Sequence, residues 1–358
     1  MTIKTIHELT IGDLKARLPI IQGGMGIGVS LSGLASAVAN AGGIGVISGV
    51  QTGFREPDFL KNNLEANKRA IIREIRRAKE LTNGIIGINF LAAMTNYKEL
   101  VATAVQEKVD LIISGAGLPL DLPALVKGTK TKIAPIVSSA KAAAVISKAY
   151  DKRFGRTADL FVVEGPEAGG HLGFKKEDLT EGTAKSLQEL IPEVIEALKP
   201  FEEKYNVKIP VIAAGGIFTG TDIAEFIKLG AAGVQMGTRF VATEECDADL
   251  PFKEAYVSAR KEDLKLVQSP VGMPGRAIIN DFTRQLDAEG SIKVKRCYNC
   301  LKPCNPATTP YCISDALMTS AGGQNGLIFA GSNAWRLDQI LSVQELMKEL
   351  EEDLFKAL

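Results

Sequence analysis

Residues 158–173 read ADLFVVEGPEAGGHLG, an apolar run followed by a glycine-rich loop. The run from Leu160 to Val163 is typical of a buried strand. The loop carries His171, one of only two histidines in the chain, and the unperturbed pKa of histidine suits proton transfer near neutral pH. The stretch therefore predicts a strand that brings a catalytic His171 to a ligand, with a flexible loop and an incidental histidine as the alternative.

Short apolar runs of this kind alternate with helix-like segments along much of the chain. Seven further runs lie at residues 19–25, 44–48, 85–90, 111–114, 133–137, 209–214 and 233–236. Eight strand–helix alternations predict an α/β fold with a parallel sheet, and the number eight favours a closed (β/α)8 TIM barrel over an open sheet. Residues that follow the strands would then meet at one face of the barrel, where active sites lie.

Beyond residue 240 the pattern changes to short helical pieces, prolines and a group of cysteines. We therefore predict a barrel formed by residues 1–240 and completed by a helix within residues 333–358. Residues 241–332 would form a smaller, mainly helical lid or substrate domain. The chain of 358 residues, with 46% hydrophobic residues, is long enough for both.

The composition narrows the class of ligand. Lys and Arg number 42, as do Asp and Glu, so the net charge gives no case for nucleic acid or an anionic membrane. The sequence has no apolar run long enough to cross a bilayer, and its first residues lack the apolar core of a secretory signal. We expect a cytoplasmic protein that acts on a small molecule.

Glycine-rich loops follow the seventh and eighth runs. Gly215 and Gly216 follow the seventh run, and Gly237 and Thr238 follow the eighth. In many TIM barrels these two loops bind a phosphate through backbone N–H groups. The pair predicts a phosphate-bearing ligand, although tight packing of strand against helix would also require glycine.

Five ordered motifs resemble those of the nitronate monooxygenase family, formerly called 2-nitropropane dioxygenase, which includes the FMN-dependent enoyl-acyl carrier protein reductase II. They are QGGM at 22–25, GINF at 87–90, EGPEAGGH at 164–171, AAGGI at 213–217 and QMGTRF at 235–240. A sixth, GQNGLI, lies at 323–328. The resemblance implies a barrel that holds FMN beneath a smaller substrate-binding domain.

The resemblance also implies roles for single residues. His171 would stand near the reactive edge of the flavin. The FMN-binding residues would include the two glycine-rich loops described above. In full they would be Gly24, Met25, Asn89, Glu164, Gly169, Gly170, Gly215, Gly216, Gln235, Met236, Gly237, Thr238 and Gln324. One departure concerns Glu164, because the monooxygenases usually have glutamine there whereas the reductases have glutamate.

The function expected from this resemblance is FMN-dependent oxidation of nitronates or nitroalkanes with O2. Glu164 favours an alternative, an NAD(P)H-dependent enoyl-acyl carrier protein reductase or a quinone or flavin reductase. A third possibility is a barrel that binds a nucleotide phosphate without flavin. NAD(P)H is thus a candidate co-substrate, and an acyl carrier protein and a second copy of the chain are candidate partners.

Four of the five cysteines lie close together in the sequence, at Cys297, Cys300, Cys304 and Cys312. Four thiols at this spacing suit tetrahedral ligation of zinc or an iron–sulfur cluster. An iron–sulfur cluster could pass electrons to FMN, whereas zinc would only hold the lid together. Unrelated free cysteines are the alternative.

Overall fold

The computed structural model describes residues 6–358 and has an eight-stranded parallel sheet at its centre. Its strands are β3 (Ile20–Gln22), β4 (Gly45–Ser48), β5 (Ile86–Leu91), β6 (Leu111–Gly115), β7 (Lys132–Val137), β8 (Phe161–Glu164), β10 (Val211–Ala214) and β11 (Gly233–Met236). Their order in the sheet is β3-β11-β10-β8-β7-β6-β5-β4. All eight predicted strands are confirmed.

The sheet curls into a barrel because its two end strands meet. Gln22 N donates to Ile44 O at 2.9 Å, and Ile44 N donates to Ile20 O at 2.9 Å, so β3 joins the start of β4. The predicted TIM barrel is thereby confirmed.

The strands are apolar along their whole length because both of their faces are buried. One set of side chains, including Ile21, Val46 and Val162, fills the barrel interior. The alternate set, including Ile20, Ile47 and Val163, packs against the surrounding helices. A hairpin of β1 (Leu9–Ile11) and β2 (Leu14–Ala16) adds its apolar side chains to the interior cluster.

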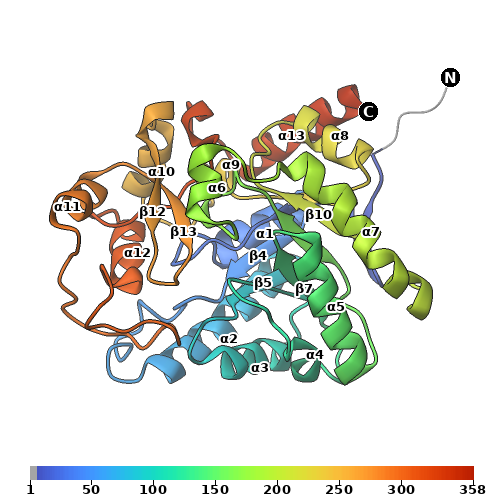
Figure 1. The fold of residues 1–358 in the computed structure, drawn as a ribbon, viewed down its shortest axis with the longest axis horizontal. Helices are drawn as coiled ribbons and strands as arrows, with labels where there is room; N and C mark the ends of the chain where they lie inside the picture. Colours follow the sequence, from blue (N-terminus) through green and yellow to red (C-terminus); the bar gives the residue numbers. More distant parts are fainter. Residues whose placement is uncertain (1–5) are drawn as a thin grey trace.

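Helices surround the barrel (Figure 1). They are α1 (Ser32–Asn40), α2 (Asn63–Leu81), α3 (Tyr97–Gln106), α4 (Leu122–Leu125), α5 (Ala140–Phe154), α6 (Lys176–Glu181), α7 (Leu187–Tyr205), α8 (Gly220–Lys228) and α9 (Thr238–Val241). The last helix, α13 (Val343–Ala357), returns to pack on α8 and α1. Glu349 of α13 accepts hydrogen bonds from the Arg239 guanidinium at 3.0 and 3.1 Å, which ties the C-terminal helix to α9, the short helix after β11.

Residues 241–332 lie together beside the barrel, as the orange elements of Figure 1 show. They form α10 (Leu250–Val257), β12 (Leu264–Gln268), β13 (Pro274–Ile278), α11 (Asp281–Glu289) and α12 (Ile313–Ala321). Besides the expected helices, this region has a sheet that the sequence did not reveal. The sheet has the order β12-β13-β9, and β9 (Gly170–His171) comes from the barrel.

Asp247 joins the smaller region to the barrel at the start of α1. The helix has no side-chain cap from its own N-cap residue, Leu31. Asp247 instead accepts hydrogen bonds from the backbone N–H groups of Leu31, Gly33 and Leu34, at 2.7, 3.2 and 3.1 Å. These are N–H groups that the first turn of a helix leaves unpaired.

None of the helices within residues 6–358 is both long and apolar enough to cross a membrane.

Candidate active site

A cavity of about 260 Å³ lies at the carboxyl ends of the barrel strands. The carboxyl ends of β3, β5, β8, β10 and β11 and the residues that follow them form much of its walls, and Phe252, Tyr256, Leu317 and Phe329 of the smaller region cover it. This volume lies close to the lower end of the range for small-molecule sites, about 300–1,000 Å³. The position is the one at which TIM barrels carry their active sites.

The cavity brings most of the sequence-predicted residues together. His171 lines it, as do Gly24, Met25, Asn89, Glu164, Gly169, Gly170, Gly215, Gly216, Gln235, Met236, Gly237 and Thr238. Gln324 is exposed and lies outside the lining. Its motif instead connects α11 to α12, because Asn325 Oδ1 accepts from Phe282 N at 2.9 Å and Gly326 O accepts from Asn280 Nδ2 at 2.7 Å.

Backbone forms part of the wall where side chains have no room. Gly216 has φ +78°, and a Cβ there would lie 2.2 Å from Glu167 Oε2. A Cβ on Gly24 would lie 2.4 Å from Asn89 Cβ. Glycine at these two positions therefore lets the main chain face the cavity directly.

Glu164 ends β8 and faces the cavity. Burial raises the pKa of its carboxyl group to about 8, and no charged neighbour among residues 6–358 offsets that effect. The carboxyl group therefore carries a proton at neutral pH. It can donate a hydrogen bond or a proton, which an ionised glutamate cannot.

His171 is held at the cavity by the added strand β9. It pairs with Gly275 of β13, its Nε2 lies 2.7 Å from Ser269 Oγ, and its ring meets the Phe329 ring edge-on with centroids 5.1 Å apart. Burial lowers the pKa of His171 to about 4. The imidazole is therefore neutral at neutral pH, and its contact with Ser269 fixes the orientation of the ring.

Comparison with known proteins identifies the family to which this chain belongs. The sequence model of nitronate monooxygenase matches residues 8–353, nearly the whole chain. The chain belongs to the nitronate monooxygenase family. The members of this family are FMN-dependent oxidoreductases, so the barrel-mouth cavity is that of a flavin enzyme family.

Individual relatives of this nitronate monooxygenase family member carry different names. The chain is 27% identical to a probable nitronate monooxygenase of Bacillus subtilis, over 94% of this chain and 96% of the relative. It is 29% identical to a carboxyl-CoA dehydrogenase of Rhodococcus jostii, (3aS,4S,5R,7aS)-5-hydroxy-7a-methyl-1-oxo-octahydro-1H-indene-4-carboxyl-CoA dehydrogenase, over 77% of this chain. The match spans only 66% of that dehydrogenase.

A solved structure, FabK from Thermotoga maritima, has the same overall shape. It superposes with a TM-score of 0.70 at 27% identity, covering 94% of this chain and 93% of FabK. The chain is thus similar both to a nitronate monooxygenase and to FabK, within the family that the sequence model establishes.

Two residues that support the site were missed by sequence reasoning. Ser269 contacts His171 across 98 residues of sequence. Arg276 Nη1 donates to Pro166 O at 2.9 Å and to Ala168 O at 2.6 Å, which fixes the loop that leads into His171. Both contacts depend on the pairing of β9 with β13, and no local sequence pattern predicts that pairing.

The predicted metal centre at the four cysteines is not supported. Within residues 6–358, no group of three or more His, Cys, Asp or Glu side chains is arranged to hold a metal ion. Cys297 is exposed, whereas Cys300, Cys304 and Cys312 are partly buried. Burial raises the thiol pKa of Cys300, and raises that of Cys312 to about 11.

Proposed function

We propose that this protein is an FMN-dependent oxidoreductase that oxidises nitronates with O2, and nitroalkanes through their nitronates. The observation that carries the proposal is the cavity in which neutral His171 meets the residues expected to bind FMN. The full-length similarity to a probable nitronate monooxygenase supports the choice of substrate.

Two features of the cavity fit FMN. The buried Gln235 Oε1 has no hydrogen-bond partner within the described residues, and the isoalloxazine ring carries an N–H group that could donate to it. Gly215, Gly216, Gly237 and Thr238 form an open, glycine-rich wall after β10 and β11, where a phosphate would find backbone N–H groups. Met25, from the loop after β3, and Asn89, from the carboxyl end of β5, would lie against the ring.

When bound, FMN would supply the redox chemistry by taking electrons from the substrate and passing them to O2. The protein supplies orientation. With a pKa near 4, His171 is a weak base, so it is suited to positioning a nitronate that is already deprotonated. Ser269 holds the ring for this role through its 2.7 Å contact with Nε2.

A reductase of enoyl thioesters is a second candidate, favoured by Glu164. Reduction of a carbon–carbon double bond consumes a hydride and a proton. Glu164 carries a proton at neutral pH and faces the cavity, so it could deliver that proton. The likeness to FabK, an enoyl-acyl carrier protein reductase II, supports this candidate. In that case NAD(P)H would be the electron donor and an acyl carrier protein or coenzyme A would carry the substrate.

Steady-state assays separate the two candidates. For nitronate oxidation, we expect O2 uptake and nitrite release with preformed propionate 3-nitronate or 2-propyl nitronate. NADH or NADPH consumption with crotonyl-coenzyme A, and no O2 uptake with either nitronate, would favour the reductase. A purified protein without flavin absorbance near 450 nm would overturn both and favour a barrel that binds a nucleotide phosphate.

A further inference from the structure

A second, smaller chamber opens beside the main cavity. Val50, Leu91, His171 and Leu317 line both spaces, so the chamber continues from the place where His171 meets the substrate. Its volume is about 40 Å³. A buried water needs about 10–15 Å³ by this kind of measure, so the chamber holds a group of roughly three or four non-hydrogen atoms.

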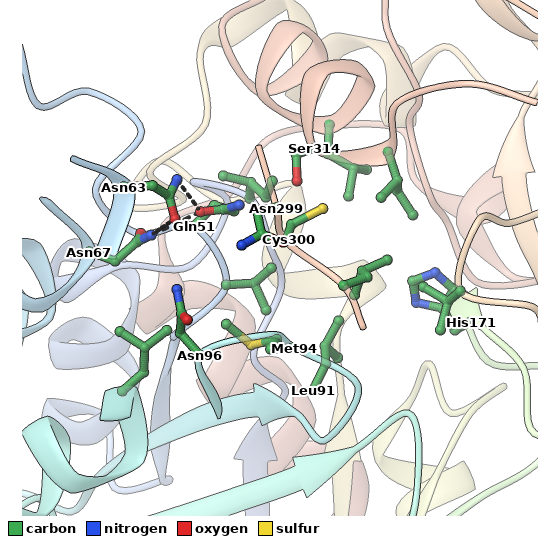
Figure 2. A pocket seen from close by; sticks show the side chains of 17 residues that line it. Gln51, Asn63, Asn67, Leu91, Met94, Asn96, His171, Asn299, Cys300 and Ser314 are labelled. Atoms are coloured by element: carbon green, nitrogen blue, oxygen red, sulfur yellow. Dashed lines mark hydrogen bonds between the residues drawn. The ribbon is translucent and has the colours of Figure 1, made fainter. Parts of the chain in front are cut away.

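The chamber has an apolar middle and a carboxamide end. Figure 2 shows Gln51, Asn63 and Asn67 gathered on one side, His171 on the opposite side, and Leu91 and Met94 below the space between them. The lining also includes Asn96 and Asn299. Among residues 6–358, no Asp, Glu, Lys or Arg lines this chamber.

Hydrogen bonds within the carboxamide end determine which atom is left for a ligand. Gln51 Oε1 accepts from Asn63 Nδ2 at 3.0 Å and from Asn67 Nδ2 at 2.9 Å. Asn67 Oδ1 in turn accepts from Gly53 N at 2.9 Å. Asn63 Oδ1 also accepts from Asn67 Nδ2, at 3.0 Å. All three amide oxygens of this group are therefore occupied, whereas Gln51 Nε2 donates no hydrogen bond to another described residue. Gln51 Nε2 is thus a free donor at the point where these three side chains meet the chamber.

The backbone also holds these carboxamide side chains in defined positions at the chamber. Asn63 and Asn67 lie one turn apart on α2 and so share a face. Gln51 has φ +50°, a left-handed conformation that glutamine rarely adopts. The residue is only 3% exposed. Such a conformation persists where the surrounding structure enforces it, and it occurs preferentially at functional sites.

We infer that this chamber is a subsite for a neutral carbonyl group of the substrate, which accepts a hydrogen bond from Gln51 Nε2. The inference rests on the proposed function only in placing the reacting end of the substrate beside His171. A ketone, ester, thioester or amide carbonyl matches the free donor. A carboxylate or phosphate does not, because no cation lines the chamber to compensate for its lost hydration.

Three isosteric probes test the inference without turnover. They are 2-pentanone, butanamide and butanoate, which share one skeleton and differ at one substituent of the carbonyl carbon. Calorimetric titration of the flavin-loaded protein should show 2-pentanone and butanamide binding at least about tenfold more tightly than butanoate, because a hydrogen bond is gained and no buried charge is left unpaired. Butanoate binding as tightly as 2-pentanone would overturn the inference.

Gln51→Glu supplies the second comparison. It preserves the shape and one acceptor oxygen but replaces the ligand-facing donor with an acceptor. We expect it to weaken 2-pentanone binding about tenfold, whereas Gln106→Glu, on the exposed face of α3, should leave it unchanged. Equal affinity in wild type and Gln51→Glu would also refute the subsite. Flavin content is measured separately by absorbance, so loss of the proposed function would be seen independently of these affinities.

Discussion

Glu164→Gln is the substitution whose outcome the cavity specifies most closely. Burial raises the pKa of Glu164 from 4.5 to about 8. At pH 7 the protonated form then exceeds the ionised form by about 10 to 1, whereas a carboxyl group of pKa 4.5 would be ionised by about 300 to 1. Glutamine is neutral at every pH and closely matches the protonated glutamate in shape, so it reproduces the state that the structure assigns to Glu164.

The sign of the pH effect follows from the charge of the substrate. Above pH 8 Glu164 ionises and places a negative charge in the cavity that must accept an anionic nitronate. We expect kcat/KM for preformed nitronate to be flat near neutral pH and then to fall about tenfold per pH unit above 8. In Glu164→Gln this alkaline fall should disappear, and the rate at pH 7 should stay within about threefold of wild type.

The assay is initial-rate O2 uptake with preformed nitronate from pH 6 to pH 10, at constant ionic strength. An alkaline fall that persists unchanged in Glu164→Gln would refute the assignment of that pKa to Glu164. If Glu164 instead donates a proton during enoyl reduction, Glu164→Gln should lower the rate of enoyl thioester reduction at pH 7 by about 10²-fold or more. The same variant thus separates an electrostatic role from an acid role.

Three further substitutions test the site and its supports. His171→Ala should keep FMN, measured by absorbance after denaturation, but lose most turnover, by about 10²-fold; unchanged turnover would contradict its central role. Ser269→Ala should lower kcat about tenfold, because the His171 ring loses its 2.7 Å contact, and the exposed Ser258→Ala should not; equal effects would contradict a positioning role. Asp247→Ala should lower the free energy of unfolding in urea by about 1–3 kcal/mol, because N–H groups at the start of α1 lose their acceptor; no change would show that this cap is unimportant.

The sequence was sufficient to predict the barrel because its strands are buried on both faces. Runs such as Leu160 to Val163 are apolar throughout, and the glycines and polar residues that follow them meet at the barrel mouth for reasons of topology alone. Residues assigned from these strand ends, including Asn89, His171 and Thr238, therefore line one cavity.

Features that depend on long-range pairing could not be predicted in this way. The contact of Ser269 with His171 and the hydrogen bonds of Arg276 to the preceding loop arise from β9 and β13, which are far apart in sequence. Spacing also says nothing about side-chain direction. For this reason the sequence could not show that Gln324 lies at the surface. Nor could it show that Cys297, Cys300, Cys304 and Cys312 do not form a metal site among the described residues.

The most direct test of the proposed function is the visible spectrum of the purified protein, recorded anaerobically before and after substrate is added. The account predicts flavin absorbance near 450 nm that bleaches rapidly when preformed nitronate is mixed in, and that returns on admission of O2. Bleaching by NADH or NADPH but not by nitronate, or a protein with no flavin absorbance, would contradict it.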